Sequence, residues 1–305
     1  METQSESVRG HVTALATILI WGMTFISTKV LLVTFTPLEI LFLRFAVGFV
    51  ALLVIYPRRL KLANKKQEGL FIGAGISGIT LYFLLENVAL TMTTASNVGI
   101  IVTIAPFFTA LLSIVFLKAE KPKVQFYIGF VVAIVGIGLI SYNGNGLELN
   151  PMGDLLAILA AAAWAIYSIL IRKIADLGHD TIPATRRVFM YGLLFIAPLL
   201  FVMDFNLETV QFASFENVGN ILFLGLGASA LCFVTWNIAV KLLGAVKTSV
   251  YIYLVPVVTV TASILILKEP VTPVLIIGAS FTLVGLWISE TKLFGKTVRK
   301  ASAQR

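Results

Sequence analysis

Apolar stretches about as long as a membrane span recur along nearly the whole chain, separated by short polar breaks that contain Pro and Gly. A helix needs about 20 mainly apolar residues to cross a bilayer, and it satisfies its own backbone hydrogen bonds there. The pattern therefore predicts an all-α integral membrane protein with ten transmembrane helices. The expected ranges are 10–33, 36–56, 69–90, 94–117, 123–142, 153–175, 183–203, 216–240, 246–267 and 272–291.

The breaks carry residues that begin or end helices. Prolines stand at or near expected starts, where a missing N–H costs little; they are Pro37, Pro122, Pro151, Pro183 and Pro273. A turn-rich Asn-Gly-Asn-Gly sequence occupies 143–146, near the middle of the chain. We therefore expect two units of five helices each, 1–146 and 147–305.

Composition supports a membrane class and leaves no room for a soluble domain. The 305 residues are 58% hydrophobic and only 12% charged, with a mean hydropathy of +0.97. A soluble core cannot hide that much apolar surface. The first apolar run, Val12 to Val33, exceeds the roughly 7 to 15 residues of a signal-peptide core, so we expect it to be a retained span.

The basic residues predict orientation, because Lys and Arg favour cytoplasmic loops. With the N-terminus in the cytoplasm, all 23 Lys and Arg fall on the inside except Lys29, Arg44 and Lys268. The outer loops then carry acidic residues: Glu148, Asp154, Asp204, Glu208, Glu216 and Glu269. We expect a multi-pass protein of the cell (inner) membrane with both termini cytoplasmic. The net charge of +8 is spread over many short loops, so nucleic acid is not an expected partner.

Few residues are suited to metal or cofactor chemistry. Cys232 is the single cysteine, and His11 and His179 are the only histidines. Neither a disulfide framework nor a zinc site follows from that set. The chain also lacks a GxxxxGK[ST] phosphate loop, so we expect no cofactor, no catalytic residues and no direct use of ATP.

The two halves repeat each other. Residues 81–118, moved by 150 positions, fall on 231–268 without a gap. The positions identical in both copies are Leu81, Phe83, Asn87, Ala89, Ala95, Pro106, Thr109, Ser113, Ile114, Leu117 and Lys118. Because each unit has an odd number of spans, the second must lie inverted in the bilayer, an arrangement common in transporters. A duplicated scaffold without transport is the alternative.

These residues also resemble a known family. The family that they look like is the drug/metabolite transporter superfamily, EamA type, on these motifs: Trp21-Gly22 followed by Lys29, Arg44-Phe45, Ala95-Ser96, Pro106, and the related loops Lys118-Ala119-Glu120-Lys121-Pro122 and Lys268-Glu269-Pro270. The resemblance covers essentially the whole chain. It implies a ten-helix inverted-repeat transporter whose relatives often export amino acids and other metabolites. Position 190, the counterpart of Arg44 in the second half, is Met, so the likeness between halves is incomplete there.

Four ionisable residues fall inside predicted spans, where a charge costs about 2.5 to 3.5 kcal/mol. They are Lys29, Glu39, Arg44 and Glu86. One interpretation is an outer gate, in which Glu86 or Glu39 pairs with Lys29 or Arg44 while the cavity faces the cytoplasm. The other is structural: Lys29 and Glu39 reach the interface, and Arg44 pairs or caps carbonyls. Glu86 is also a candidate proton-coupling carboxylate.

Further candidates lie on paired helices. Asn87 and Asn237 suit hydrogen bonds between helices or contact with substrate. Pro106 and Pro256 predict kinks that expose a carbonyl, or plain packing. The predicted substrate-binding aromatic residues, for stacking or cation–π contact, are Trp21, Tyr82, Trp164, Tyr167, Trp236 and Tyr253; interfacial belts are the alternative for them. A stripe of Gly69, Gly73, Gly75 and Gly78 predicts close helix packing, with a role in dimerisation as the alternative.

The sequence thus predicts a secondary transporter or facilitator that exports small amphipathic metabolites, with amino acids the leading class. Its partners are a small-molecule substrate and membrane lipids, with proton coupling through Glu86 as one mode. A phosphate-sugar or nucleotide-sugar antiporter is the alternative of the same fold, since Lys29 and Arg44 are suited to phosphate. An integral-membrane enzyme acting on lipid-like substrates is the alternative from another class.

Overall fold

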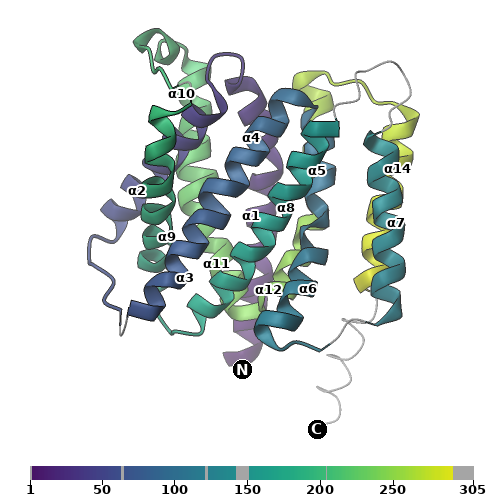
Figure 1. The fold of residues 1–305 in the computed structure, drawn as a ribbon, viewed down its shortest axis with the longest axis horizontal. Coiled ribbons are helices and arrows are strands. Elements are labelled where there is room, and N and C mark those ends of the chain that lie inside the picture. The colour runs from purple at the N-terminus through teal and green to yellow at the C-terminus, as the bar shows by residue number, and fades with distance from the viewer. Residues whose placement is uncertain (1, 63–64, 121–122, 142–150, 204, 291–305) are drawn as a thin grey trace.

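Every element in the described part of the chain is helical, as the computed structural model in Figure 1 shows. The structure describes residues 2–62, 65–120, 123–141, 151–203 and 205–290. The predicted all-α class is confirmed over these residues. The turn-rich segment 143–146, with the expected boundary between the two units, lies outside them, as do Pro122, Glu148 and Asp204.

The N-terminal half consists of five successive helical rods, two of which contain a short segment of other helix geometry. They are α1 (Glu2–Leu31); α2 (Pro37–Ile55); α3 (Lys65–Gly75), π-helical η1 (Ile76–Leu81) and α4 (Tyr82–Met92); α5 (Ala95–Ile101), 3₁₀-helical η2 (Val102–Ile104) and α6 (Ala105–Leu117); and α7 (Val124–Ser141).

The C-terminal half repeats this order. Its rods are α8 (Pro151–Ala175); α9 (Thr181–Ile196) with 3₁₀-helical η3 (Ala197–Phe201); α10 (Phe215–Leu222), π-helical η5 (Phe223–Leu231) and α11 (Cys232–Leu243); α12 (Ala245–Ser249), 3₁₀-helical η6 (Val250–Leu254), α13 (Val255–Ala262) and π-helical η7 (Ser263–Leu267); and α14 (Pro273–Glu290). A short 3₁₀ turn, η4 (Thr209–Phe212), precedes α10.

The described helices include eight that are long and apolar enough to cross a membrane. They are Glu6–Leu31, Pro37–Ile55, Lys65–Met92, Ala95–Leu117, Pro151–Ala175, Thr181–Phe201, Phe215–Leu243 and Ala245–Leu267. Two shorter apolar stretches, Val124–Ile137 and Pro273–Gly285, belong to α7 and α14. The chain is therefore a multi-pass membrane protein, while ten spans remain a prediction.

Helix starts follow local chemistry. At α2, the Thr36 side chain accepts from the Glu39 N–H, and the Glu39 carboxylate accepts from the Thr36 N–H at 2.8 Å. This reciprocal pair satisfies two backbone donors that have no partner inside the helix. The first rod begins at Glu2 instead of residue 10, because residues 2–9 contain no Pro or Gly that would stop the helix.

Departures from α geometry occur at equivalent places in both halves. The π-helical η1 lies 150 positions before the last six residues of η5, and 3₁₀-helical η2 precedes Pro106 just as η6 precedes Pro256. Lys118 and Lys268, which end the fourth rod of each half, both adopt the left-handed conformation, with φ 53° and 54°. The sequence predicts kinks at Pro106 and Pro256, next to η2 and η6, but neither the π-helical segments nor the left-handed lysines.

Rods of the two halves interleave. The helix α1 packs on α11 and α13, whereas α8 packs on α4 and α6. In Figure 1, α3 lies low and α4 high, but α10 lies high and α11 low, so the third rods of the two halves run in opposite directions. We call the end where α1 begins the lower end and the opposite end the upper end (Figure 1).

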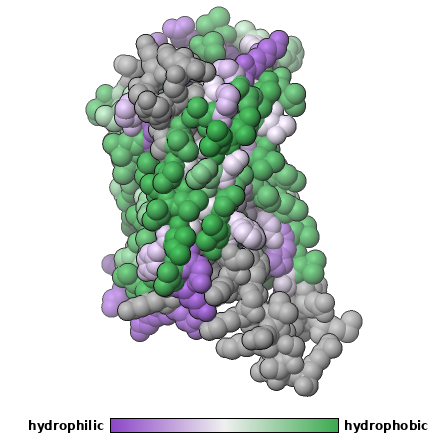
Figure 2. Space-filling model, turned by 90° about the vertical axis from the view of Figure 1, so that its right-hand side faces the viewer, coloured by the Kyte–Doolittle hydropathy of each residue, from purple (hydrophilic) through white to green (hydrophobic). Residues whose placement is uncertain are grey.

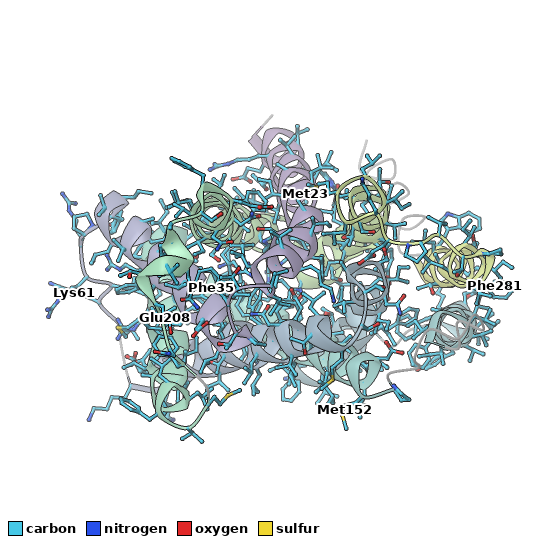
Figure 3. All side chains as sticks on the ribbon, turned by 90° about the horizontal axis from the view of Figure 1, so that it is seen from above. Met23, Phe35, Lys61, Met152, Glu208 and Phe281 are labelled. Carbon is cyan, nitrogen blue, oxygen red and sulfur yellow. The ribbon has the colours of Figure 1, made fainter. Side chains whose placement is uncertain are left out.

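The helices α7 and α14 pack on each other along their length. They stand at one side of the bundle, as the view from above shows (Figure 3). Phe281 lies on the outer side of this pair and is 44% exposed. A broad apolar band covers this side of the molecule, with hydrophilic residues toward the upper and lower ends (Figure 2). That pattern fits a surface in contact with lipid acyl chains.

Candidate functional site

A small cavity lies between the two halves of the chain. The N-terminal half contributes Trp21, Thr24, Arg44, Tyr82 and Glu86 to its lining, and the C-terminal half contributes Trp164, Ile252 and Val255. Val102 begins the 3₁₀ segment η2, and Val255 directly follows the 3₁₀ segment η6; both residues line the cavity. The volume of about 40 Å³ is enough for a few water molecules.

Arg44 on α2 is almost completely buried, with 1% of its surface exposed. Its Nε donates to Ser229 Oγ at 3.2 Å, and its guanidinium carbon lies 4.1 Å from the ring centroid of Phe83. Within the described part of the chain, Nη1 and Nη2 have no hydrogen-bond partner. A cation held over a ring gains some stabilisation, but the two unpartnered nitrogens still carry a desolvation cost.

Glu86 on α4 lies one turn after Tyr82 and is 1% exposed. Its Oε1 has no hydrogen-bond partner among the described residues. Glu86 lies within electrostatic reach of Arg44, yet no ion pair within 4.0 Å joins these two described residues. The cavity therefore holds a guanidinium group and a carboxyl group on two different helices that do not contact each other.

Five of the six predicted aromatic residues form one cluster of ring contacts, and three of the five line the cavity: Trp21, Tyr82 and Trp164. Trp21 and Trp164, on the first rod of each half, meet edge to face at 5.1 Å between ring centroids. Tyr82 lies 5.0 Å from Trp164, and Trp236 lies 5.0 Å from Trp21. The Trp21 indole N–H donates to the Ala228 carbonyl at 2.9 Å, which fixes the orientation of this ring.

Tyr167 and the two predicted asparagines serve hydrogen bonds between helices. The Asn87 amide donates to the Pro37 carbonyl at 3.0 Å. In the second half, Asn237 donates to Thr185 Oγ1 and accepts from the Tyr167 hydroxyl, each at 3.0 Å. Neither asparagine lines the cavity. The predicted interhelical bonds are present, and a substrate role for these residues remains a prediction.

Two of the predicted gate residues bond backbone groups in this structure. The Lys29 ammonium donates to the carbonyls of Leu90 and Thr93, the latter at 2.8 Å. Besides its capping role, Glu39 accepts from the Asn206 N–H at 2.8 Å. Lys29 thus joins the ends of the first and third rods, and Glu39 joins the start of α2 to the segment between η3 and η4. Both side chains lie outside the cavity lining.

The remaining predicted residues also lie outside the lining. Pro106 and Pro256 stand in the first turn of α6 and α13, directly after the 3₁₀ segments. A missing N–H costs little there, so the prolines fit the change of helix type. Tyr253 is half-buried on η6 and packs against the core.

Sequence reasoning missed the partners of Arg44 and the role of Glu269. Ser229 and Phe83 contact Arg44, but nothing in their sequence setting marks a site. Glu269 accepts from the N–H groups of Ala95 and Ser96 at 2.9 and 3.2 Å, and from Ser96 Oγ at 2.6 Å. It thereby joins the fourth rods of the two halves at the upper end. The Lys-Glu-Pro motif and the Ala-Ser motif were both visible in the sequence, but their contact was not.

Comparisons with known proteins agree over most of the chain. The model of the EamA-like transporter family matches residues 8–142 and again residues 151–291. An uncharacterized transporter of Archaeoglobus fulgidus is 28% identical over 289 residues, which are 92% of this chain and 97% of that protein. A solved structure, titled only as the crystal structure of a protein, aligns with a TM-score of 0.65 at 17% identity and covers 97% of this chain and 99% of its own.

Two similar proteins have more specific names. A probable amino-acid metabolite efflux pump of Escherichia coli is 28% identical over 312 residues, covering 97% of this chain and 98% of its own. A probable terminal-alkyne amino-acid exporter of Streptantibioticus cattleyicolor is 24% identical over 287 residues, covering 94% of each. The resemblance noted in the sequence is confirmed: with both halves matched by the family model, the chain belongs to the EamA-like transporter family.

Proposed function

We propose that this protein is a secondary transporter or facilitator that exports small amphipathic metabolites, amino acids foremost, by alternating access. The observation that carries the proposal is the cavity between the two halves, where Arg44 and Glu86 lie buried among aromatic rings. Intramembrane charges that face a cavity are costly and commonly mark a substrate or ion pathway. The names of the two amino-acid exporters among its relatives favour the same class of solute.

The proposal includes inverted repeats over units 1–146 and 147–305. Support comes from the helix interruptions at equivalent positions, the matched left-handed Lys118 and Lys268, and the opposite directions of the third rods. The packing of the two halves is also equivalent. The first rod of each half packs on the third and fourth rods of the other: α1 on α11 and α13, and α8 on α4 and α6. Two such halves can open toward either side of the membrane by moving against each other.

We place the lower end in the cytoplasm of a cell whose inner membrane holds the protein, with both termini inside. The upper ends are then joined by Glu269 to Ala95 and Ser96, by Lys29 to the end of α4, and by Glu39 to Asn206. Opening outward requires these contacts to separate. Arg44 and Glu86 form a second part of the proposed gate, because the distance between them changes as α2 and α4 move. Glu86 binds a proton more readily when the Arg44 cation is farther away.

The alternatives have less support from the geometry. A phosphate-sugar or nucleotide-sugar antiporter was expected to use both Lys29 and Arg44, but Lys29 donates to carbonyls outside the cavity and Glu86 places a carboxylate beside Arg44. A lipid-directed enzyme needs clustered acids or histidines at one interface. The printed names of the similar proteins favour a transporter over such an enzyme.

The test combines binding with transport. Purified protein in detergent is screened by thermal shift against amino acids, amines and sugar phosphates, and each stabilising compound is then tested for counterflow in liposomes. Saturable counterflow of an amino acid without chemical change supports the proposal. Counterflow of phosphorylated solutes alone would replace it by the antiporter, and chemical conversion of the solute would replace it by an enzyme.

A further inference from the structure

The central cavity contains two buried charges whose polar atoms are incompletely used. Arg44 presents Nη1 and Nη2, and Glu86 presents Oε1, all without a hydrogen-bond partner among the described residues. Both side chains line the cavity, and they form no direct ion pair in this part of the chain. Buried polar groups in proteins nearly always find partners, so this arrangement is completed by what enters the cavity.

We propose that the cavity recognises the zwitterionic head group of an α-amino acid, with Arg44 binding the carboxylate and Glu86 binding the ammonium. The assignment rests on the proposed function and adds which groups of the exported solute are bound and by which residues. The Nε of Arg44 is held by Ser229, which leaves the other two nitrogens for a carboxylate. Charge-assisted hydrogen bonds of this kind are among the strongest in proteins.

The balance of charge selects a zwitterion over singly charged solutes. With Glu86 ionised by an approaching ammonium group, Arg44 and Glu86 together contribute one positive and one negative charge to a cavity of low dielectric constant. A zwitterion pairs with both and adds no net charge, whereas a simple amine leaves Arg44 unpaired and a phosphate faces the Glu86 carboxylate. An unpaired charge in such a cavity costs free energy because it has lost its water and gained no partner.

The rest of the lining favours an apolar or aromatic side chain on the amino acid. Trp21, Tyr82 and Trp164 form adjoining walls, with the rings of Trp21 and Trp164 at nearly right angles. Edge-to-face and cation–π contacts suit both an aromatic ring and an ammonium group. The cavity of about 40 Å³ has room for only a few water molecules, so binding of an amino acid has to move these rings apart.

The first test uses wild-type protein in detergent and three ligands that share a phenyl ring. Phenylalanine has both charged groups, phenylethylamine lacks the carboxylate, and 3-phenylpropionate lacks the ammonium. Binding is followed by tryptophan fluorescence, because Trp21 and Trp164 line the cavity. We expect phenylalanine to bind at least tenfold more tightly than either analogue. This series tests the assignment whether or not any variant folds.

The second test determines which residue binds the carboxylate of the ligand and which binds its ammonium group. In Arg44→Gln, the preference for phenylalanine over phenylethylamine should fall to within about twofold, while the preference over 3-phenylpropionate persists. Glu86→Gln should show the opposite pattern. Matched controls are Arg186→Gln and Asp154→Asn, since both residues are buried and lie outside the cavity lining. The controls should keep both wild-type preferences.

Failure of this assignment is distinguishable from failure of the proposed function. Equal binding of the analogues and phenylalanine would overturn the assignment, as would unchanged preferences in Arg44→Gln and Glu86→Gln. Saturable counterflow of a solute without an α-amino acid head group, in the same preparation, would leave the transporter proposal standing without the assignment. Absence of counterflow by every solute in the panel would overturn both.

Discussion

Individual glycines determine how closely the rods approach. The sequence predicts close packing along the stripe from Gly69 to Gly78, and the structure supports it for only part of that stripe. A Cβ on Gly78 would lie 2.1 Å from the nearest ring atom of Tyr167, and one on Gly75 would lie 2.7 Å from the Gly192 nitrogen. By contrast, nothing lies within 4 Å of a Cβ on Gly69, so packing there was wrongly predicted.

Gly78→Ala should destabilise the protein by about 1 to 3 kcal/mol, the usual cost of overpacking. The Tyr167 ring has to move, and its hydroxyl is then drawn away from Asn237. Thermal unfolding in detergent measures the effect, with Gly69→Ala as the matched control because its Cβ enters open space. Equal melting temperatures for Gly78→Ala and the control would contradict this packing.

The residue types of the site were predictable, whereas most of their partners were not. A charge in an apolar span is conspicuous in a sequence, so Arg44 and Glu86 could be singled out. Which groups they meet depends on rods more than a hundred residues apart, as with Arg44 and Ser229. Lys29 was expected to pair with an acid or reach the interface, but the nearby end of α4 offers carbonyls that lack partners within their own helix.

At the scale of elements, the composition of the rods was predictable but most of their interruptions were not. Hydropathy and proline positions set most span limits to within a few residues, as for the rod that begins at Pro37, but α1 begins well before its expected start at residue 10. Short π and 3₁₀ segments such as η1 and η2 leave the apolar pattern unchanged, because they alter only local hydrogen bonding. They depend on packing between rods, which a periodic pattern does not encode.

The contact of Glu269 with Ala95 and Ser96 holds the fourth rods of the two halves together at the upper end. A carboxylate that accepts backbone N–H groups at a helix start is also favoured by the helix dipole. We expect Glu269→Ala to shift the protein toward outward opening. The reporter is Thr24→Cys, since Thr24 lines the cavity, in a Cys232→Ala background that retains counterflow.

Labelling of this cysteine by a membrane-impermeant maleimide, applied to intact cells, should become severalfold faster with Glu269→Ala. Glu216→Ala is the control, because this exposed acid lies at the same end and does not join the fourth rods. An unchanged labelling rate in Glu269→Ala would mean that this contact does not hold the upper end closed.

At the scale of the whole molecule, the proposed inversion of the two halves would place equivalent segments on opposite sides of the membrane. The fourth rods end at Lys118 and Lys268 in the same backbone conformation, and the exposed residues Ala119 and Val271 follow them. In the Cys232→Ala background, Val271→Cys should react with the impermeant maleimide in intact cells. Ala119→Cys should react only after permeabilisation. Labelling of both from one side would refute the inverted arrangement.

Inversion also predicts a second closure that works in the opposite sense. Glu120 and Glu269 each precede a glycine by nine residues, Gly129 and Gly278, so Glu120 is the counterpart of Glu269. Repeat symmetry pairs it with the start of α12 at Ala245, the equivalent of Ala95. Glu120 is exposed in this structure, whereas Glu269 is engaged at the upper end, as expected when only one side is closed.

Glu120→Ala should therefore favour the inward-facing state, because it removes an interaction that forms only when the lower end closes. A mutation that stabilises or destabilises one state shifts the population of both. The Thr24→Cys reporter should be labelled more slowly from outside in Glu120→Ala than in its parent, and Glu120→Ala combined with Glu269→Ala should return toward the parental rate. Acceleration by both single substitutions would show that the two carboxylates do not exchange roles, and the halves would then move without the symmetry that their sequences share.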